Sequence, residues 1–110
     1  MNMNEYQKKA QRFINKDLDD EELRAHSMLG LCSEVGELQG LFQKKLQGHG
    51  LNETHVKKEL GDVLWFVAEV ATAYGWNLEE IAQINIDKLS ARYPNGFEVE
   101  KSLHRKAGDI

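Results

Sequence analysis

Apolar side chains along this chain recur every three or four residues, with the spacing of one face of an α-helix rather than the alternation of a β-strand. A long helix is predicted over residues 20–47, with an inward stripe made by Met28, Leu31, Cys32, Val35, Leu38, Phe42 and Leu46. A second stripe predicts a helix over residues 52–75, and shorter ones predict helices over residues 4–15 and 77–93. The chain is therefore expected to be all-α, a bundle of about four helices.

The fourth of these helices has clear signals at both ends. Asn77 is expected to cap it, with Glu80 three residues later as the partner in a capping box. Pro94 is the single proline, and it is expected to end the helix. Residues 95–110 are rich in glycine and charge, and they are predicted to form a loop and a tail.

Two pairs of acidic residues carry the chemistry of the sequence. Glu34 and Glu37 are three residues apart, as are Glu59 and Asp62, so each pair lies on one side of its helix. The segment Gly48-His49-Gly50 lies between the pairs, and a reversal there would make the two helices antiparallel. Four carboxylates would then meet, which is unfavourable unless a cation lies among them. Oxygen ligands of this kind favour Mg²⁺, or alternatively Mn²⁺.

Other polar and aromatic positions admit two interpretations each. Asn85, Lys88 and Arg92 form one stripe of the fourth helix, where cations also favour the helix dipole. Beside a metal site, the same stripe indicates phosphate recognition. Trp65 is placed opposite the inward stripe of its helix, which predicts either a contact between subunits or a wall for base stacking. Glu69 is expected to be solvated.

Composition sets the class of protein. A length of 110 residues predicts one domain, residues 1–110, with a core of about 20–97 and a tail of about 98–110. The net charge is −4 and no dense basic run occurs, so binding to a nucleic acid polymer is not expected. No apolar run is long enough for a membrane span or a signal peptide. The single cysteine, Cys32, fits a reducing cytoplasm and is expected to be buried.

Apolar residues outside the inward stripes predict that the protein is not a monomer. Leu29 and Leu41 on the second helix, and Trp65 and Phe66 on the third, lie at or beyond the edge of the inward arc. Three main helices cannot cover them all, and exposed apolar patches of that size are unusual in monomers. We therefore expect oligomerisation to complete the core.

The acidic pairs and the end of the fourth helix together resemble a known family, the MazG-like nucleoside triphosphate pyrophosphohydrolases. The resemblance covers about residues 25–97. It rests on Glu34-x-x-Glu37, on Glu59-x-x-Asp62 and on the segment Asn85-Ile-Asp-Lys88-Leu-Ser-Ala-Arg92-Tyr-Pro-Asn-Gly-Phe. It implies an all-α fold, a homodimer or homotetramer, and Mg²⁺-dependent cleavage of a (d)NTP to a (d)NMP and pyrophosphate.

The resemblance also implies roles for individual residues. Glu34, Glu37, Glu59 and Asp62 would hold the metal and form the catalytic centre, while Asn85, Lys88 and Arg92 would contact phosphates. Either Glu34 or Glu37 is the candidate general base for the attacking water. The expected task is the removal of unwanted nucleotides from the pool.

Two other functions are compatible with the same residues. One is a non-catalytic helical oligomer that binds a metal or a nucleotide. The other is hydrolysis of phosphoribosyl-ATP, since enzymes of that kind share the acidic pattern. The preferred base and sugar, the phosphorus attacked and the number of metal ions stay open at this point.

Overall fold

The computed structural model describes all residues 1–110 and confirms an all-α chain without β-strands. The elements are α1 (Met3–Ala10), a 3-10 turn η1 (Gln11–Phe13), α2 (Asp20–Leu46), α3 (Glu53–Ala73), α4 (Leu78–Arg92) and α5 (Val99–Leu103). None of these helices is both long enough and apolar enough to cross a membrane.

Side-chain caps explain where the long helices begin. Asp19 accepts a hydrogen bond from the backbone N–H of Glu22, and the Glu22 side chain accepts one from the backbone N–H of Asp19, which makes a capping box at the start of α2. Asn77 caps α4 by accepting from the N–H groups of Glu79 and Glu80. Glu80 does not return a bond to Asn77, so the capping box predicted there is wrong and Asn77 acts as a simple cap.

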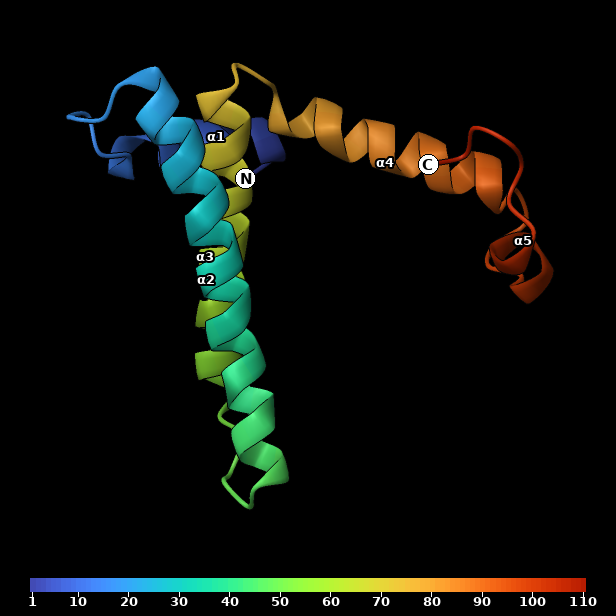
Figure 1. Cartoon of the computed structure of the whole chain (residues 1–110), viewed down its shortest axis with the longest axis horizontal. Helices are drawn as coiled ribbons and strands as arrows, with labels where there is room; N and C mark the ends of the chain where they lie inside the picture. Colours follow the sequence, from blue (N-terminus) through green and yellow to red (C-terminus); the bar gives the residue numbers. More distant parts are fainter.

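The helices do not close into one bundle. α2 and α3 form a long antiparallel hairpin (Figure 1). α1 packs against the end of the hairpin that lies opposite the turn between α2 and α3. α4 extends away from the hairpin toward α5. The radius of gyration is 17.2 Å, whereas a compact chain of this length has about 13 Å. The chain is thus a hairpin from which α4 and α5 project, and these two helices form an arm.

The small core lies where α1, α3 and the start of α4 meet. Ala10, Ala68 and Leu78 form it, and Trp65 packs against them. The indole Nε1 of Trp65 donates a hydrogen bond to the carbonyl of Ala10 at 3.1 Å. Trp65 is therefore half-buried under α1, and the prediction that it lies exposed is wrong. The prediction considered only the apolar spacing within α3, whereas α1 covers that side of α3.

Glycine permits close packing between α2 and α3 at one point. A Cβ atom built at Gly30 would overlap the ring of Phe66, so any larger residue would push the two helices apart. Phe66 is half-buried there, and its ring meets Trp65 edge-on at a centroid distance of 4.9 Å. The aromatic pair thus fastens the hairpin to α1.

Much of the apolar surface is uncovered by the chain itself. Only 7 of 110 residues are buried, and the solvent-accessible surface is 8346 Å². A compact monomer of 12.6 kDa exposes about 6,200 Å². The exposed apolar side chains include Met28, Leu29, Val35, Phe42, Ile84, Ile86 and Leu89. Five of the seven residues in the stripe predicted to face inward on α2 are therefore exposed, and Cys32, predicted to be buried, is one of them.

The C-terminal residues are more ordered than a loop and tail. Five of them form α5, and Asp109 folds back to pair with Arg92 at the end of α4. The helix lacks a side-chain cap and is too short to show an apolar stripe, which explains why the sequence pattern did not indicate it.

Candidate metal centre

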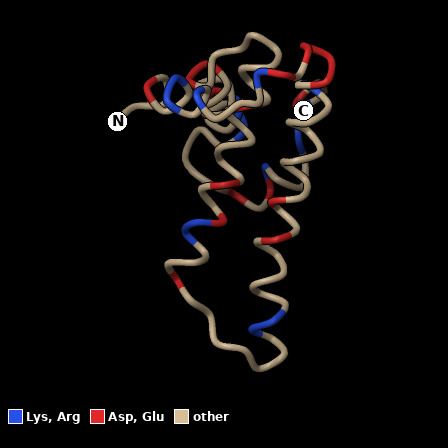
Figure 2. The backbone as a smooth tube through the Cα atoms, turned by 90° about the vertical axis from the view of Figure 1, so that its left-hand side faces the viewer, with Lys and Arg blue, Asp and Glu red and all other residues tan.

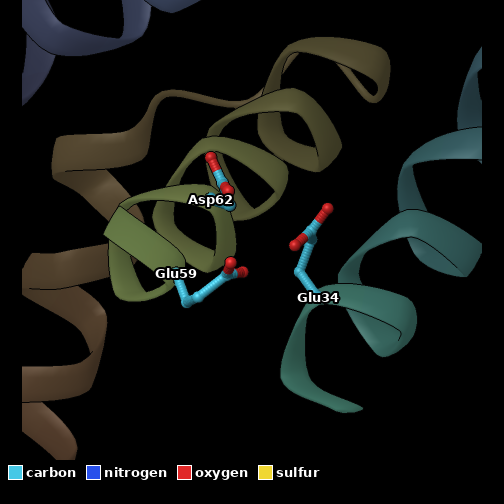
Figure 3. A group of neighbouring side chains, drawn as sticks. All are labelled: Glu34, Glu59 and Asp62. Carbon is cyan, nitrogen blue, oxygen red and sulfur yellow. The ribbon is translucent and has the colours of Figure 1, made fainter. Parts of the chain in front are cut away.

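Three of the predicted acids meet across the hairpin. Glu34 reaches from α2 toward Glu59 and Asp62 on α3, and one carboxylate oxygen of each lies within 4.8 Å of the others (Figure 3). Figure 2 shows acidic residues at similar heights on the two helices of the hairpin. The arrangement follows from the three-residue spacing on α3 and from the reversal at Gly48, whose φ of 99° suits glycine.

Glu37 takes a different position from the other three. It is exposed and stands outside the group of three oxygens. Its carboxyl nevertheless interacts with Glu34, one turn earlier on α2. The structure therefore brings together Glu34, Glu59 and Asp62, with Glu37 at the edge.

The electrostatics of the cluster favour a cation. Oε2 of Glu34 and Oε2 of Glu59 are both buried without a hydrogen-bond partner, an arrangement that is costly for carboxylates. Burial raises the pKa of Glu34, and the nearby charges of Glu37, Asp62 and Glu59 raise it further. The converging donors are hard oxygens only, so the residues fit a divalent cation such as Mg²⁺.

Two neighbours of the acids were not connected to them by the sequence pattern. The His55 side chain is about half exposed, and its Nε2 lies 3.2 Å from Oε1 of Glu59, one turn away on α3. The four-residue spacing of this pair was the available signal. Tyr6 on α1 has its pKa raised by burial and then by the charge of Asp62. No local pattern connects Tyr6 to Asp62, because their approach depends on the packing of α1.

Glu69 is buried rather than solvated, so that prediction is wrong. Its Oε1 lies 2.9 Å from Nδ1 of His26 on α2, and its Oε2 has no partner. Asp62 and Glu69 are seven residues apart on α3 and share a face. The face that holds the acids therefore continues along the hairpin to the buried Glu69, whose partner His26 is about half exposed.

The predicted phosphate contacts lie elsewhere. Asn85, Lys88 and Arg92 are on α4, which extends away from the hairpin (Figure 1). All three are thus separated from the acids of their own chain. Arg92 is half-buried and its guanidinium donates to Asp109, whereas Asn85 and Lys88 are exposed.

Comparison with known proteins gives a family for most of the chain. The model of the MazG nucleotide pyrophosphohydrolase domain matches residues 24–97. The chain is also 33% identical over 85 residues to the Gene 37 protein of Mycobacterium phage L5, which covers 73% of this chain and 75% of that protein. No solved structure matches significantly. The matched residues include the acidic cluster and α4, and they end before α5.

Proposed function

This chain belongs to the MazG nucleotide pyrophosphohydrolase family, and on that premise we propose that it cleaves a (d)NTP to a (d)NMP and pyrophosphate with Mg²⁺. The observation that supports the reaction best is the convergence of Glu34, Glu59 and Asp62 with two buried, unpartnered carboxylate oxygens. We propose a role in clearing unwanted nucleotides from the cytoplasmic pool.

Each acid has a role in this proposal. Glu34, Glu59 and Asp62 would hold the cation, and His55 would orient Glu59 through the contact of 3.2 Å. Bound Mg²⁺ would polarise the phosphoryl oxygens and lower the pKa of a water. Glu37 is exposed beside the cluster and outside the ligand oxygens, so it is our choice for the general base that takes the proton of the attacking water.

The phosphate-binding side of the site is proposed to come from a second copy of the chain. Lys88 and Arg92 are carried by an arm that leaves its own hairpin, and the same arm exposes Ile84, Ile86 and Leu89. Docking of this arm on the exposed apolar stripe of another α2 would cover both surfaces and bring the cations toward the acids. A homodimer, or a tetramer made from two dimers, would satisfy this geometry.

A panel of substrates tests the function against its rivals. Pyrophosphate release would be measured for the common NTPs and dNTPs and for phosphoribosyl-ATP, with Mg²⁺ and with EDTA. We expect release from at least one nucleoside triphosphate with Mg²⁺ and none with EDTA. Release from phosphoribosyl-ATP alone would support phosphoribosyl-ATP hydrolysis as the function instead. Binding of nucleotide and Mg²⁺ without release from any compound would support a non-catalytic oligomer.

A further inference from the structure

A basic cavity lies between the end of α4 and the C-terminal residues. Its volume is about 300 Å³, and its lining carries five cationic side chains, Lys88, Arg92, Lys101, Arg105 and Lys106. Two of the five are on α4, within the matched family domain, and three come from residues 98–110, outside it. The cavity is therefore built by the family domain and a segment beyond it.

The charge of the cavity is opposite to that of the whole chain. The chain has a net charge of −4 and 14 Lys and Arg residues, so five of them around one cavity is a strong local excess. The single carboxylate in the lining belongs to Asp109, and it pairs with Arg92. The other four cations form no ion pair. Like charges that converge without partners favour binding of an anion.

Asp109 is already paired with Arg92, the most enclosed of these cations. Nε of Arg92 donates to Oδ2 of Asp109, and Nη2 donates to Oδ1, both at 2.8 Å. The Arg92 side chain is only 9% exposed. The Arg92 bond, with the charges of Arg105 and Lys88, keeps the pKa of Asp109 below its usual value, so this carboxylate is ionised. A guanidinium binds phosphate through the same two-pronged geometry, so Asp109 occupies the place of a phosphate group.

We propose that residues 98–110 complete a polyphosphate-binding cavity with Lys88 and Arg92, and that the polyphosphate displaces Asp109 from Arg92. Asp109 would then be an internal competitor that holds Arg92 in place until an anion arrives. The inference deepens the proposed function, on which it rests for the identity of the anion: the phosphate chain of the nucleotide or the pyrophosphate released from it. A volume of 300 Å³ equals about ten water molecules, enough for a pyrophosphate.

Calorimetry without metal tests the cavity apart from catalysis. Sodium pyrophosphate would be titrated into the full chain in EDTA, and into Arg105→Ala, Asp109→Asn and, as control, Lys8→Ala, an exposed lysine on α1. We expect wild type to bind, Arg105→Ala to bind about fivefold or more weakly, and Lys8→Ala to match wild type. Asp109→Asn should bind tighter than wild type, because the competing charge is gone. A second titration with a non-hydrolysable α,β-methylene dNTP shows whether the cavity prefers a nucleotide or free pyrophosphate.

Other outcomes would overturn the proposal. No binding by wild type, or equal binding by Arg105→Ala, would remove the cavity as the site. Weaker binding by Asp109→Asn would show that Asp109 only positions Arg92, so displacement would be wrong. The two proposals also fail separately. Metal-free binding that follows these variants, in a protein without hydrolytic activity, would keep the cavity and reject the enzyme. Hydrolysis without such binding would support the enzyme and reject the cavity as a polyphosphate site.

Discussion

The Glu34→Gln variant should be more stable than wild type in the absence of metal. It should be less stable than wild type in the presence of Mg²⁺. Glu34→Gln keeps the size of the side chain and removes one charge. In the structure Glu34 is surrounded by the carboxylates of Glu37, Glu59 and Asp62, and its own Oε2 is buried without a partner. No cation of the chain pairs with it. The substitution therefore relieves repulsion without breaking an ion pair.

The magnitude follows from the distances in the cluster. Two unit charges 4.8 Å apart, the outer limit for the oxygens of Glu34, Glu59 and Asp62, repel by about 0.9 kcal/mol in water and by about 3.5 kcal/mol at an effective dielectric constant of 20. Asp62 is exposed, so screening lowers its share. We expect a net gain of about 1–3 kcal/mol in the free energy of unfolding, or at least about 4 °C in Tm.

Thermal unfolding in EDTA and in Mg²⁺, at equal protein concentration, is the assay. Mg²⁺ at 1,000 times its Kd should stabilise wild type by about 4.1 kcal/mol and Glu34→Gln by much less, so the order of the two proteins should reverse. Glu37→Gln is the matched control, because Glu37 is exposed and outside the three-oxygen group. Its stability should change less than that of Glu34→Gln.

The dependence of stability on pH gives the same test a second measurement. The pKa of Glu34 is raised in the folded state, so the folded protein binds a proton more readily than the unfolded chain. Metal-free wild type should therefore gain stability as pH falls through the folded-state pKa of Glu34 toward the ordinary value of 4.5. Glu34→Gln should lack that gain. A variant that is less stable than wild type in EDTA, or one with an unchanged pH profile, would refute the repulsive cluster.

Three further predictions concern the arm, the interface and the helix contact. Lys88→Ala should lower kcat/KM by at least about tenfold while calorimetry shows unchanged Mg²⁺ affinity, and a loss of Mg²⁺ affinity with normal kinetics would contradict the phosphate role. Ile86→Glu should shift the mass measured by light scattering toward the 12.6 kDa of one chain, and a wild type that is active at that mass would contradict the oligomer. Gly30→Ala should cost about 1–3 kcal/mol because its Cβ meets the Phe66 ring, whereas Gly36→Ala, in open space, should not destabilise in chemical denaturation.

The features that follow from local spacing were predictable from the sequence. α2, α3 and α4 begin and end within two residues of the predicted limits, since apolar periodicity and the residues before each helix mark them. The meeting of Glu34 with Glu59 and Asp62 also followed, because a hairpin and a three-residue spacing were sufficient to place them. The predicted first helix is instead the shorter α1 followed by η1.

Features that depend on contacts between distant residues were not predictable in this way. The exposure of Trp65 was predicted from the apolar spacing of its own helix, but α1 covers this side chain. Glu69 was expected to be solvated, but it is buried and paired with His26 on α2. The apolar periodicity of α2 identified a face to be covered, without indicating that the chain itself leaves it open. Asp109 reaches Arg92 only because α5 turns the chain back, and α5 has no periodic signal.

Phosphorus NMR of the products tests the central claim most directly. Wild type with Mg²⁺ and a dNTP substrate should produce pyrophosphate and a dNMP together, and Glu59→Gln should be slower by on the order of 10²-fold while remaining folded. Glu59 is chosen because its Oε2 is one of the buried, unpartnered oxygens of the cluster. A dNDP with orthophosphate as products, or near-normal turnover by folded Glu59→Gln, would contradict the proposed enzyme.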